Sequence, residues 1–521
     1  MMKRMAIVLS VFFLTCGCAS PTAGVIWTST PPFHEASTPD RVIVVISDLH
    51  LGLGRNAEGA WYRVEDFRWH KAIKTFLDEI SKTGNQRVDL VVAGDFLEMW
   101  QLPANVRCEG ASPDLGCTVD EMKAVATWIA KAHEDVFDDL REFSQTGENR
   151  LHIIPGNHDS SLLVAAVWEP IGEALGVESG RVNFARTGVW KSADGSIVIE
   201  HGHQIGIEAN RYSTWPDIVR TDGGKEYIIR PWGEQFVQKM FNEQENNYPI
   251  IDNLSPESAG IRYRMADRGL WGTGTDIAQF VSFNLFQTSL PQQASILGAG
   301  GDPMMISEDE PKWDITRARE HGHRLFVAAL PTNDDLRAGL LGDSEQAKKA
   351  RLELDALVSD EKRFPDENVK FLCEQAAIQS DSICETGVLG ASIVKLLVPR
   401  EWVFTTHLRR KEEEFPKMRF FIYGHTHLLE EAWQTSRVKS VQILNSGAFH
   451  RVIDEEGFLR RVKAGGMTPD EGLKKLTVED LPSCYTYVFI PYNKDPQVLR
   501  WVMKETDDAG NSVKPGDEVC K

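Results

Sequence analysis

Several apolar segments of the chain each run into acidic, amide or histidine side chains, and this recurrence constrains the fold more than any other feature. The first segment, Arg41 to Gly52, reads RVIVVISDLHLG and shows no polar alternation. Such a run fits a strand that is buried on both faces and presents polar side chains at its carboxyl end. Similar runs lead to Asp95, Asn157, His201 and His425. The pattern predicts a layered α/β domain with ligands gathered at the strand ends.

Helical patterns lie between the first four segments, as from Phe67 to Lys82 and from Val119 to Phe143. The alternation stops near residue 206, and residues 207–415 are rich in helix-forming stretches. We therefore predict a large, mainly helical insertion, longer than an ordinary loop. The predicted order is a signal peptide (1–17), a flexible tether (18–40), the first part of the core (41–206), the helical insertion or cap (207–415), the second part of the core (416–505) and a C-terminal tail (506–521).

The N-terminus resembles an export signal. It has a basic start at Lys3 and Arg4, followed by a short apolar run and the sequence LTCGC. The apolar run is too short to span a bilayer. Cys18 is placed as the acylated residue of a bacterial lipoprotein, so we expect an exported, periplasmic protein held at the membrane by an N-terminal lipid anchor. An ordinary cleaved signal is the alternative.

Six cysteines remain after the predicted signal, and they fall into short-range pairs. Disulfides suit an exported protein in an oxidising compartment. Six cysteines allow fifteen pairings, and zinc binding is the competing interpretation, although none of the pairs has the CxxC spacing of a structural zinc site. The most local pairing joins Cys108 with Cys117, Cys373 with Cys384, and Cys484 with Cys520.

The charge balance argues against nucleic acid as a partner. Acidic residues outnumber basic ones 76 to 57, which gives a net charge of −19. The field of the whole molecule repels polyanions. A phosphate-bearing substrate must therefore be attracted locally, within the site.

The side chains at the strand ends form a set of metal donors. Residues two apart in an extended chain share a face, so Asp48 with His50, and His425 with His427, can point into one cavity. Carboxylate, amide and imidazole groups suit divalent Mn, Fe, Zn, Co or Ni. The seven candidate ligands exceed what one ion needs, and two ions sharing a carboxylate would use them all. They are Asp48, His50, Asp95, Asn157, His201, His425 and His427.

These motifs, in this order, resemble those of the calcineurin-like metallophosphoesterase superfamily. The resemblance covers roughly residues 41–206 and 416–505, and it implies a four-layer β-sandwich flanked by helices. By this resemblance Asp95 bridges the two ions. One ion is held by Asp48, His50 and His427, and the other by Asn157, His201 and His425.

The expected activity is hydrolysis of a phosphodiester or pyrophosphate bond. Two ions lower the pKa of a bridging water to give hydroxide and neutralise charge on the phosphate. The resemblance implies that His158 protonates or stabilises the leaving oxygen and that Glu98 orients His158. The alternative is that Glu98 is an ordinary acidic residue on the surface or at the start of a helix. Asp159 is predicted to support the residues that bind the metals without being a ligand itself.

Other histidines are less clearly assigned. His203 shares a strand face with His201 and is a candidate substrate contact or a structural histidine, and His450 follows the last ligand motif as a possible substrate contact. The sequence EHGH occurs twice, at residues 200–203 and 320–323. The second copy lies in a helical pattern, where residues two apart point about 200° away from each other. We therefore predict that His321 and His323 bind no catalytic metal.

The wording of the motifs, with GDFLEMW, GNHD, GHTH and SGAFH, is similar to that of UDP-2,3-diacylglucosamine hydrolases. Those enzymes carry arginine where this chain has His158, act in the cytoplasm and have a shorter insertion. A phosphate-containing small molecule or amphipathic molecule is therefore the expected substrate class. The alternatives are a periplasmic nucleotidase or phosphomonoesterase, and a surface lipoprotein that binds metal without catalysis.

Overall fold

The computed structural model describes residues 26–28, 41–255, 260, 263, 314–384 and 400–502, with short gaps up to residue 255 and after residue 400, and more frequent gaps between residues 330 and 384. None of the helices in the described part of the chain combines the length and the apolar character that a membrane span requires. The predicted lipidation site, Cys18, lies outside the described residues.

The larger sheet has seven strands. Strands β2, β3, β5 and β6 are parallel, whereas β16 runs antiparallel to β2. Their parallel order brings the carboxyl ends of β2, β3 and β5 to one edge, as the sequence predicted. In spatial order the strands are β1 (Ile26–Thr28), β17 (Gln497–Val502), β16 (Tyr485–Ile490), β2 (Val42–Ile46), β3 (Val88–Ala93), β5 (Arg150–Ile154) and β6 (Val182–Phe184).

The second sheet joins segments that are far apart in the sequence. Strand β8 pairs in parallel with β12, with Ile197 opposite Phe420. The two predicted parts of the core therefore form one structure. The five strands are, in order, β13 (Leu429–Trp433), β14 (Gln442–Ser446), β12 (Phe420–Tyr423), β8 (Ile197–Glu200) and β7 (Val189–Lys191).

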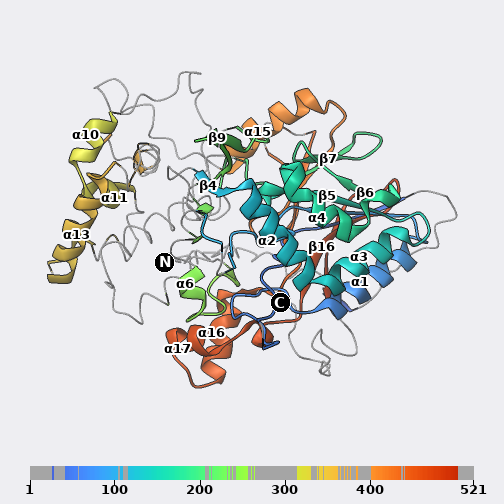
Figure 1. The fold of residues 1–521 in the computed structure, drawn as a ribbon, viewed down its shortest axis with the longest axis horizontal. Helices are drawn as coiled ribbons and strands as arrows, with labels where there is room; N and C mark the ends of the chain where they lie inside the picture. The colour runs from blue at the N-terminus through green and yellow to red at the C-terminus, as the bar shows by residue number, and fades with distance from the viewer. Residues whose placement is uncertain are drawn as a thin grey trace, which may run out of the picture.

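Alternate side chains of each central strand face different layers. In β2, Val44 and Ile46 pack with the helices, whereas Val45 belongs to the core between the two sheets. In β12, Ile422 faces that same core, and Phe421 faces outward. Because both faces are buried, these strands carry the uninterrupted apolar runs seen in the sequence. The result is the expected sandwich of two sheets flanked by helices (Figure 1).

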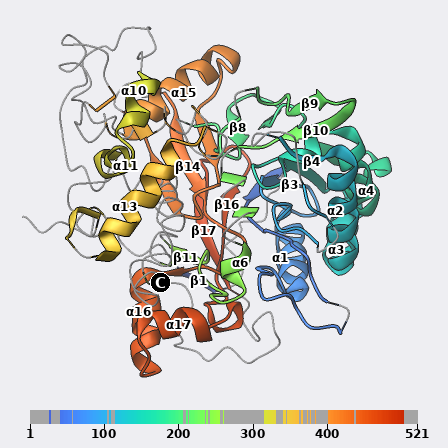
Figure 2. The same ribbon diagram turned by 60° about the vertical axis from the view of Figure 1, so that its left-hand side comes forward.

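Helices cover the outer faces of both sheets (Figures 1 and 2). On the seven-stranded sheet lie α1 (His70–Thr83), α2 (Val119–Ala132), α3 (Glu134–Gln145) and α4 (Ala165–Leu175). A capping box between Thr118 and Glu121 starts α2. The predicted single helix from Val119 to Phe143 is divided at His133, whose φ of −117° and ψ of 32° are not helical. Helix α15 (Arg400–Glu414) covers the five-stranded sheet with Phe404 and Leu408.

The insertion is helical in part and also contributes strands. Strands β9 (Val219–Asp222) and β10 (Lys225–Ile229) form a sheet with β4 (Leu115–Thr118), and β11 (Leu254–Ser255) pairs with β15 (Ile453–Asp454). These pairings fix the start of the insertion to the core, a contact that helical periodicity alone did not predict. Its described helices include α6 (Asn242–Glu245), α10 (Ile315–Glu320), α11 (His323–Ala329) and α13 (Glu345–Val358). The described residues also form α16 (Glu455–Ala464) and α17 (Pro469–Lys475), with 3₁₀ turns at Ser160–Leu163, Val177–Ser179 and Val478–Asp480.

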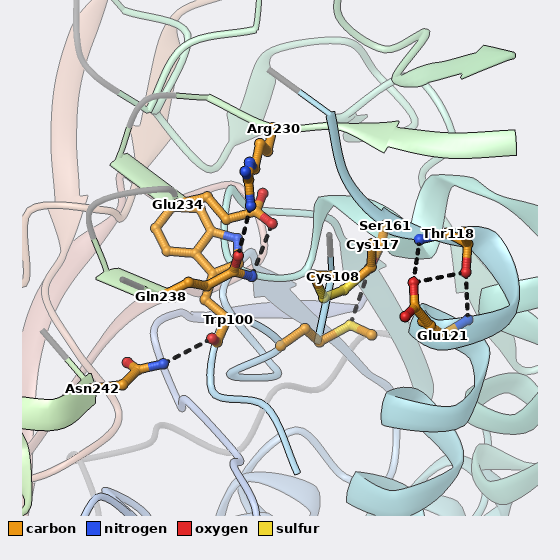
Figure 3. Close-up of a disulfide and its surroundings, with 11 residues drawn as sticks. Trp100, Cys108, Cys117, Thr118, Glu121, Ser161, Arg230, Glu234, Gln238 and Asn242 are labelled. Atoms are coloured by element: carbon orange, nitrogen blue, oxygen red, sulfur yellow. Dashed lines mark hydrogen bonds between the residues drawn. A yellow bond between two sulfur atoms is a disulfide. The ribbon is translucent and has the colours of Figure 1, made fainter. Parts of the chain in front are cut away.

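Two of the predicted disulfides are present. Cys108 is bonded to Cys117 immediately before α2, as Figure 3 shows, and Cys373 is bonded to Cys384 in the insertion. Cys484 is also disulfide-bonded. Its predicted partner, Cys520, lies outside the described residues.

Candidate metal centre

Besides the group His50, Glu98 and His158, two groups of side chains that could hold a metal ion lie where the strands end. Each contains one carboxylate and two imidazoles, and within each group the ligand atoms lie within 4.8 Å of one another. Each group combines segments from both predicted parts of the core. The first group is Asp48, His50 and His427, and the second is Asp95, His201 and His425.

In the first group, imidazole nitrogens converge on a carboxylate. Nε2 of His50 lies 3.3 Å from Nε2 of His427. Oδ1 of Asp48 lies 3.4 Å from the His427 nitrogen and 4.0 Å from the His50 nitrogen. Oδ1 of Asp48 is also buried and accepts no hydrogen bond from the described residues. A buried carboxylate oxygen without a donor is costly, and a cation is the partner that this set of atoms fits.

The second group is linked to the first by Asp95. Oδ2 of Asp95 lies 2.9 Å from Nε2 of His201 and 4.0 Å from Nε2 of His50. Oδ1 of Asn157 lies 3.0 Å from the same His201 nitrogen, while His201 Nδ1 lies 2.9 Å from the carbonyl oxygen of Ala93. A hydrogen bond from Nδ1 to that carbonyl leaves Nε2 as the ligand atom. Asp95 therefore lies between the two groups, the position expected of a shared ligand.

The backbone at five of the candidate ligands is in the left-handed region. The φ angle lies between 47° and 70° at Asp48, His50, Asp95, His425 and His427. Residues other than glycine seldom adopt this conformation, which costs roughly 1 to 3 kcal/mol at each position. Strain of this kind concentrates at functional sites. The rest of the fold thus holds these side chains in place and compensates for the free-energy cost of the left-handed backbone.

Glycines next to the ligands make room for them. A Cβ atom added to Gly94 would lie 2.4 Å from Cγ of His201, and one added to Gly156 would lie 2.1 Å from Oδ1 of Asp95. Both distances are too short for any side chain. The glycines of the GD and GN sequences are therefore required by the close approach of the ligands.

Glu98 connects a candidate ligand with the candidate acid. Its Oε2 atom lies 2.6 Å from Nδ1 of His158 and 3.0 Å from Nδ1 of His50. If each imidazole donates through Nδ1, its reactive nitrogen is Nε2. Burial alone would raise the pKa of Glu98, but His158 and His50 lower it to about 2. The carboxylate thus contacts both rings, and its role in orienting them stays a prediction.

Trp100 is a residue of the site that the sequence did not single out. Its side chain stacks on the ring of His158, with a centroid separation of 3.8 Å and an angle of 25° between the planes. Its backbone N–H donates to Oε1 of Glu98 at 2.9 Å. The only sequence signal was its position at the end of GDFLEMW.

Asp159 and Asn445 support the loops that carry the ligands. Asp159 accepts hydrogen bonds from the backbone N–H groups of Gly156, Phe96 and Leu97, at 2.6, 2.9 and 3.2 Å. It therefore ties the second motif to the third, and its supporting role in catalysis stays a prediction. Asn445, which the sequence did not single out, donates to the carbonyl oxygen of Gly424 and accepts from another backbone N–H.

The two candidate substrate histidines are almost fully buried, each with an exposed fraction of 2%. Nδ1 of His450 lies 2.6 Å from the carbonyl oxygen of Asp48, and its ring lies 4.8 Å from that of His427. His203 packs edge-on against Trp215 at 4.4 Å. Burial lowers the pKa of both histidines well below the usual value. Their substrate contacts stay predictions, and the structure places both rings next to candidate ligands.

The electrostatics of the site favour bound cations. Burial would raise the pKa of Asp48, but His427 and other nearby imidazoles lower it to about 2. Burial would likewise raise the pKa of Asp95, but His201 and His158 hold it well below the usual value. Two ionised carboxylates are thus buried side by side with imidazoles. Such a set fits divalent ions, and the identity of the ions stays a prediction.

Residues 207–415 also reach the site from two directions. The hydroxyl group of Tyr212 lies 2.7 Å from Oγ of Ser160 and donates to the carbonyl oxygen of Asn157 at 3.3 Å. From α15, His407 and Lys411 pair with the carboxylate of Glu200, at 2.5 and 2.7 Å. Asn157 is itself a candidate ligand, and Glu200 immediately precedes the candidate ligand His201.

The second EHGH copy has a different setting. Helix α10 ends at Glu320 and α11 begins at His323, so the copy spans a break between helices and does not lie within one helix. Gly322 has a φ of 51° at this break. Nδ1 of His323 lies 2.9 Å from Oδ1 of Asp355 in α13. Neither histidine belongs to a metal-binding group among the described residues.

Comparison with known proteins agrees with this geometry. Residues 41–280 match the family model described as calcineurin-like phosphoesterase. The match contains four of the five motifs, and the fifth, which ends at His427, joins them through the pairing of β12 with β8. No curated protein matches the chain.

Proposed function

Because residues 41–280 match the calcineurin-like phosphoesterases, a family of metal-dependent hydrolases, we propose that the chain cleaves a phosphodiester or pyrophosphate bond with leaving-group assistance from His158. The observation that carries the proposal is the placement of His158 beside the two metal-binding groups, with Nδ1 2.6 Å from Glu98. Two divalent ions, when bound, supply Lewis acidity that activates water and neutralises charge on the phosphate. Asp48, His50 and His427 would hold one ion, and Asn157, His201 and His425 the other, with Asp95 shared.

The chain's own residues then act on the leaving group. With Nδ1 of His158 engaged by Glu98, Nε2 is the nitrogen that passes a proton to the departing oxygen. The side chain of His158 is 19% exposed, whereas that of Glu98 is 6% exposed. The acid therefore reaches toward solvent and substrate, and the carboxylate behind it stays shielded.

We also propose that the protein works outside the cytoplasm on a phosphate-bearing small or amphipathic molecule. The support is the N-terminal sequence, with its basic start, short apolar run and Cys18. The net charge of −19 makes nucleic acid an unfavourable substrate. Metabolic labelling with palmitate tests the anchor, since Cys18→Ser should abolish label. Label that persists in this variant would refute the acylation site.

Hydrolysis of bis(p-nitrophenyl) phosphate by Mn-loaded protein tests the activity. We expect turnover that is lost on chelation and is reduced about 100-fold or more in His158→Ala, because general acid catalysis contributes about 10²- to 10⁴-fold. His323→Ala is the matched control, because His323 also pairs through Nδ1 with a carboxylate and its side chain is 25% exposed.

The alternatives give different outcomes in the same assay. A loaded protein without turnover favours the metal-binding lipoprotein. A preference for p-nitrophenyl phosphate over the diester favours a monoesterase of the nucleotidase kind. Equal activity of wild type and His158→Ala would remove the proposed role of His158.

A further inference from the structure

The indole of Trp100 lies directly against the ring of the candidate acid, His158. The planes of its side chain and of the His158 ring are 25° apart, and the ring centroids are separated by 3.8 Å. Trp100 itself is buried, with an exposed fraction of 2%. The contact therefore covers a face of the imidazole with a large and rigid surface.

The backbone of Trp100 is held on both sides. Its N–H donates to Oε1 of Glu98 at 2.9 Å, while Oε2 of the same carboxylate lies 2.6 Å from His158. Its carbonyl oxygen accepts a hydrogen bond from Nδ2 of Asn242, in α6 of the insertion, at 3.0 Å. Figure 3 shows this bond together with the disulfide between Cys108 and Cys117, which links two residues of the segment that follows Trp100.

A single hydrogen bond does not fix the plane of an imidazole ring. The bond between His158 and Glu98 sets the position of Nδ1, but the ring can still rotate about the line through that bond. A stacked indole opposes this rotation, because tilting the ring would drive it into the tryptophan. The hydrogen bond and the stack together define the direction of Nε2.

We infer that Trp100 is a positioning residue that holds His158 in the plane required for leaving-group protonation, and that Asn242 links this position to the insertion. The inference rests on the proposed function. A misplacement of about 1 Å at a reacting group can cost about 100-fold in rate. The insertion thus acts on the chemistry through Trp100 as well as through any contact with substrate.

The first test needs no activity. The ring current of Trp100 should shift the carbon-bound protons of His158 upfield in a ¹H–¹³C NMR spectrum, and the His158→Gln variant identifies that signal. In Trp100→Leu the signal should move downfield, whereas in Trp168→Leu it should stay. Trp168 is a suitable control because it stacks on Phe184 at 4.3 Å. A signal that does not respond to Trp100→Leu overturns the inference.

The second test separates positioning from general destabilisation. Acid assistance matters most for poor leaving groups, so phenyl and p-nitrophenyl phosphodiesters are compared. We expect Trp100→Leu to lower kcat about 10-fold or more for the phenyl leaving group and less than about 3-fold for p-nitrophenol. Trp100→Phe should recover most of the loss because it keeps an aromatic face. Trp100→Leu added to His158→Gln should cause no further loss.

The outcomes distinguish this inference from the proposed function. If wild type is active but Trp100→Leu slows both substrates equally, or adds to His158→Gln, the positioning role is wrong while the activity stands. If wild type is inactive with both substrates, the proposed function and the catalytic meaning of the stack fail together. Asn242→Ala should show the same leaving-group dependence at smaller size. Asn246→Ala, on an exposed neighbour that donates to the carbonyl oxygen of Asn242, is its control.

Discussion

Glu98→Gln tests the arrangement of the site most directly, because it removes one charge and almost no volume. The carboxylate serves three donors: His158 and His50 through Oε2, and the backbone N–H of Trp100 through Oε1. An amide has one oxygen, so in either orientation its NH₂ group faces a donor. If the amide nitrogen replaces Oε2, both imidazoles lose their acceptor. If it replaces Oε1, it faces the backbone N–H of Trp100, which is also a donor, and that hydrogen bond is lost.

The expected magnitude follows from the hydrogen bond to His158. A hydrogen bond to a charged group contributes about 1.5 to 3 kcal/mol. Lost in the transition state, this corresponds to a decrease of about 10- to 150-fold in kcat/KM. Because His50 is also a candidate metal ligand, metal affinity should fall by about 10-fold or more.

Two measurements check the prediction: kcat/KM with a phenyl phosphodiester, and metal content after dialysis by mass spectrometry. Asp89→Asn is the control, because Asp89 is also a buried carboxylate that pairs with a histidine, His152, at 3.2 Å. If Glu98→Gln keeps both activity and metal content within about twofold of wild type, Glu98 does not orient either ring.

Three further predictions concern the ligands, their glycines and the stability of the core. Asp95→Asn should lose both metals and activity, because one carboxylate lies between the two groups; full metal content measured by mass spectrometry would contradict this. Gly156→Ala should destabilise the fold by roughly 1 to 3 kcal/mol and reduce metal content, since its Cβ would overlap Asp95; an unchanged melting temperature would contradict the steric argument. Burial would raise the pKa of Asp89, but His152 and Arg41 lower it to about 2, so its contribution of roughly 2 kcal/mol is present above pH 4 and is lost as pH falls toward 2. The unfolding free energy of Asp89→Asn should therefore approach that of wild type in acid, and a gap that does not narrow would count against the pairing.

Several sequence predictions carried over to the structure because they depend on local rules. The apolar run before Asp48 and the one before Asp95 became neighbouring parallel strands, since strands buried on both faces need continuous apolar residues. The cysteine pairs closest in the sequence, Cys108–Cys117 and Cys373–Cys384, are bonded because short loops bring their ends together at low entropic cost.

Other features were missed because they arise from contacts between distant segments. The sequence did not single out His152, which pairs with Asp89, 63 residues earlier, across the β3–β5 register. Strands β9 and β10 were assigned to a helical region because their alternation is short and their faces are largely exposed. A local pattern cannot show that such a hairpin is completed by β4.

The sequence by itself determined the donor types, their order along the chain and the strand ends that present them, because side-chain chemistry and apolar periodicity are properties of short segments. It also separated the two EHGH copies, since only His201 follows a buried strand. Only the tertiary structure decided that Glu98 contacts both His50 and His158, that Trp100 covers the His158 ring, and that the insertion reaches Trp100 through Asn242. These contacts depend on sheet register and on the packing of segments up to 142 residues apart, and no local periodicity encodes them.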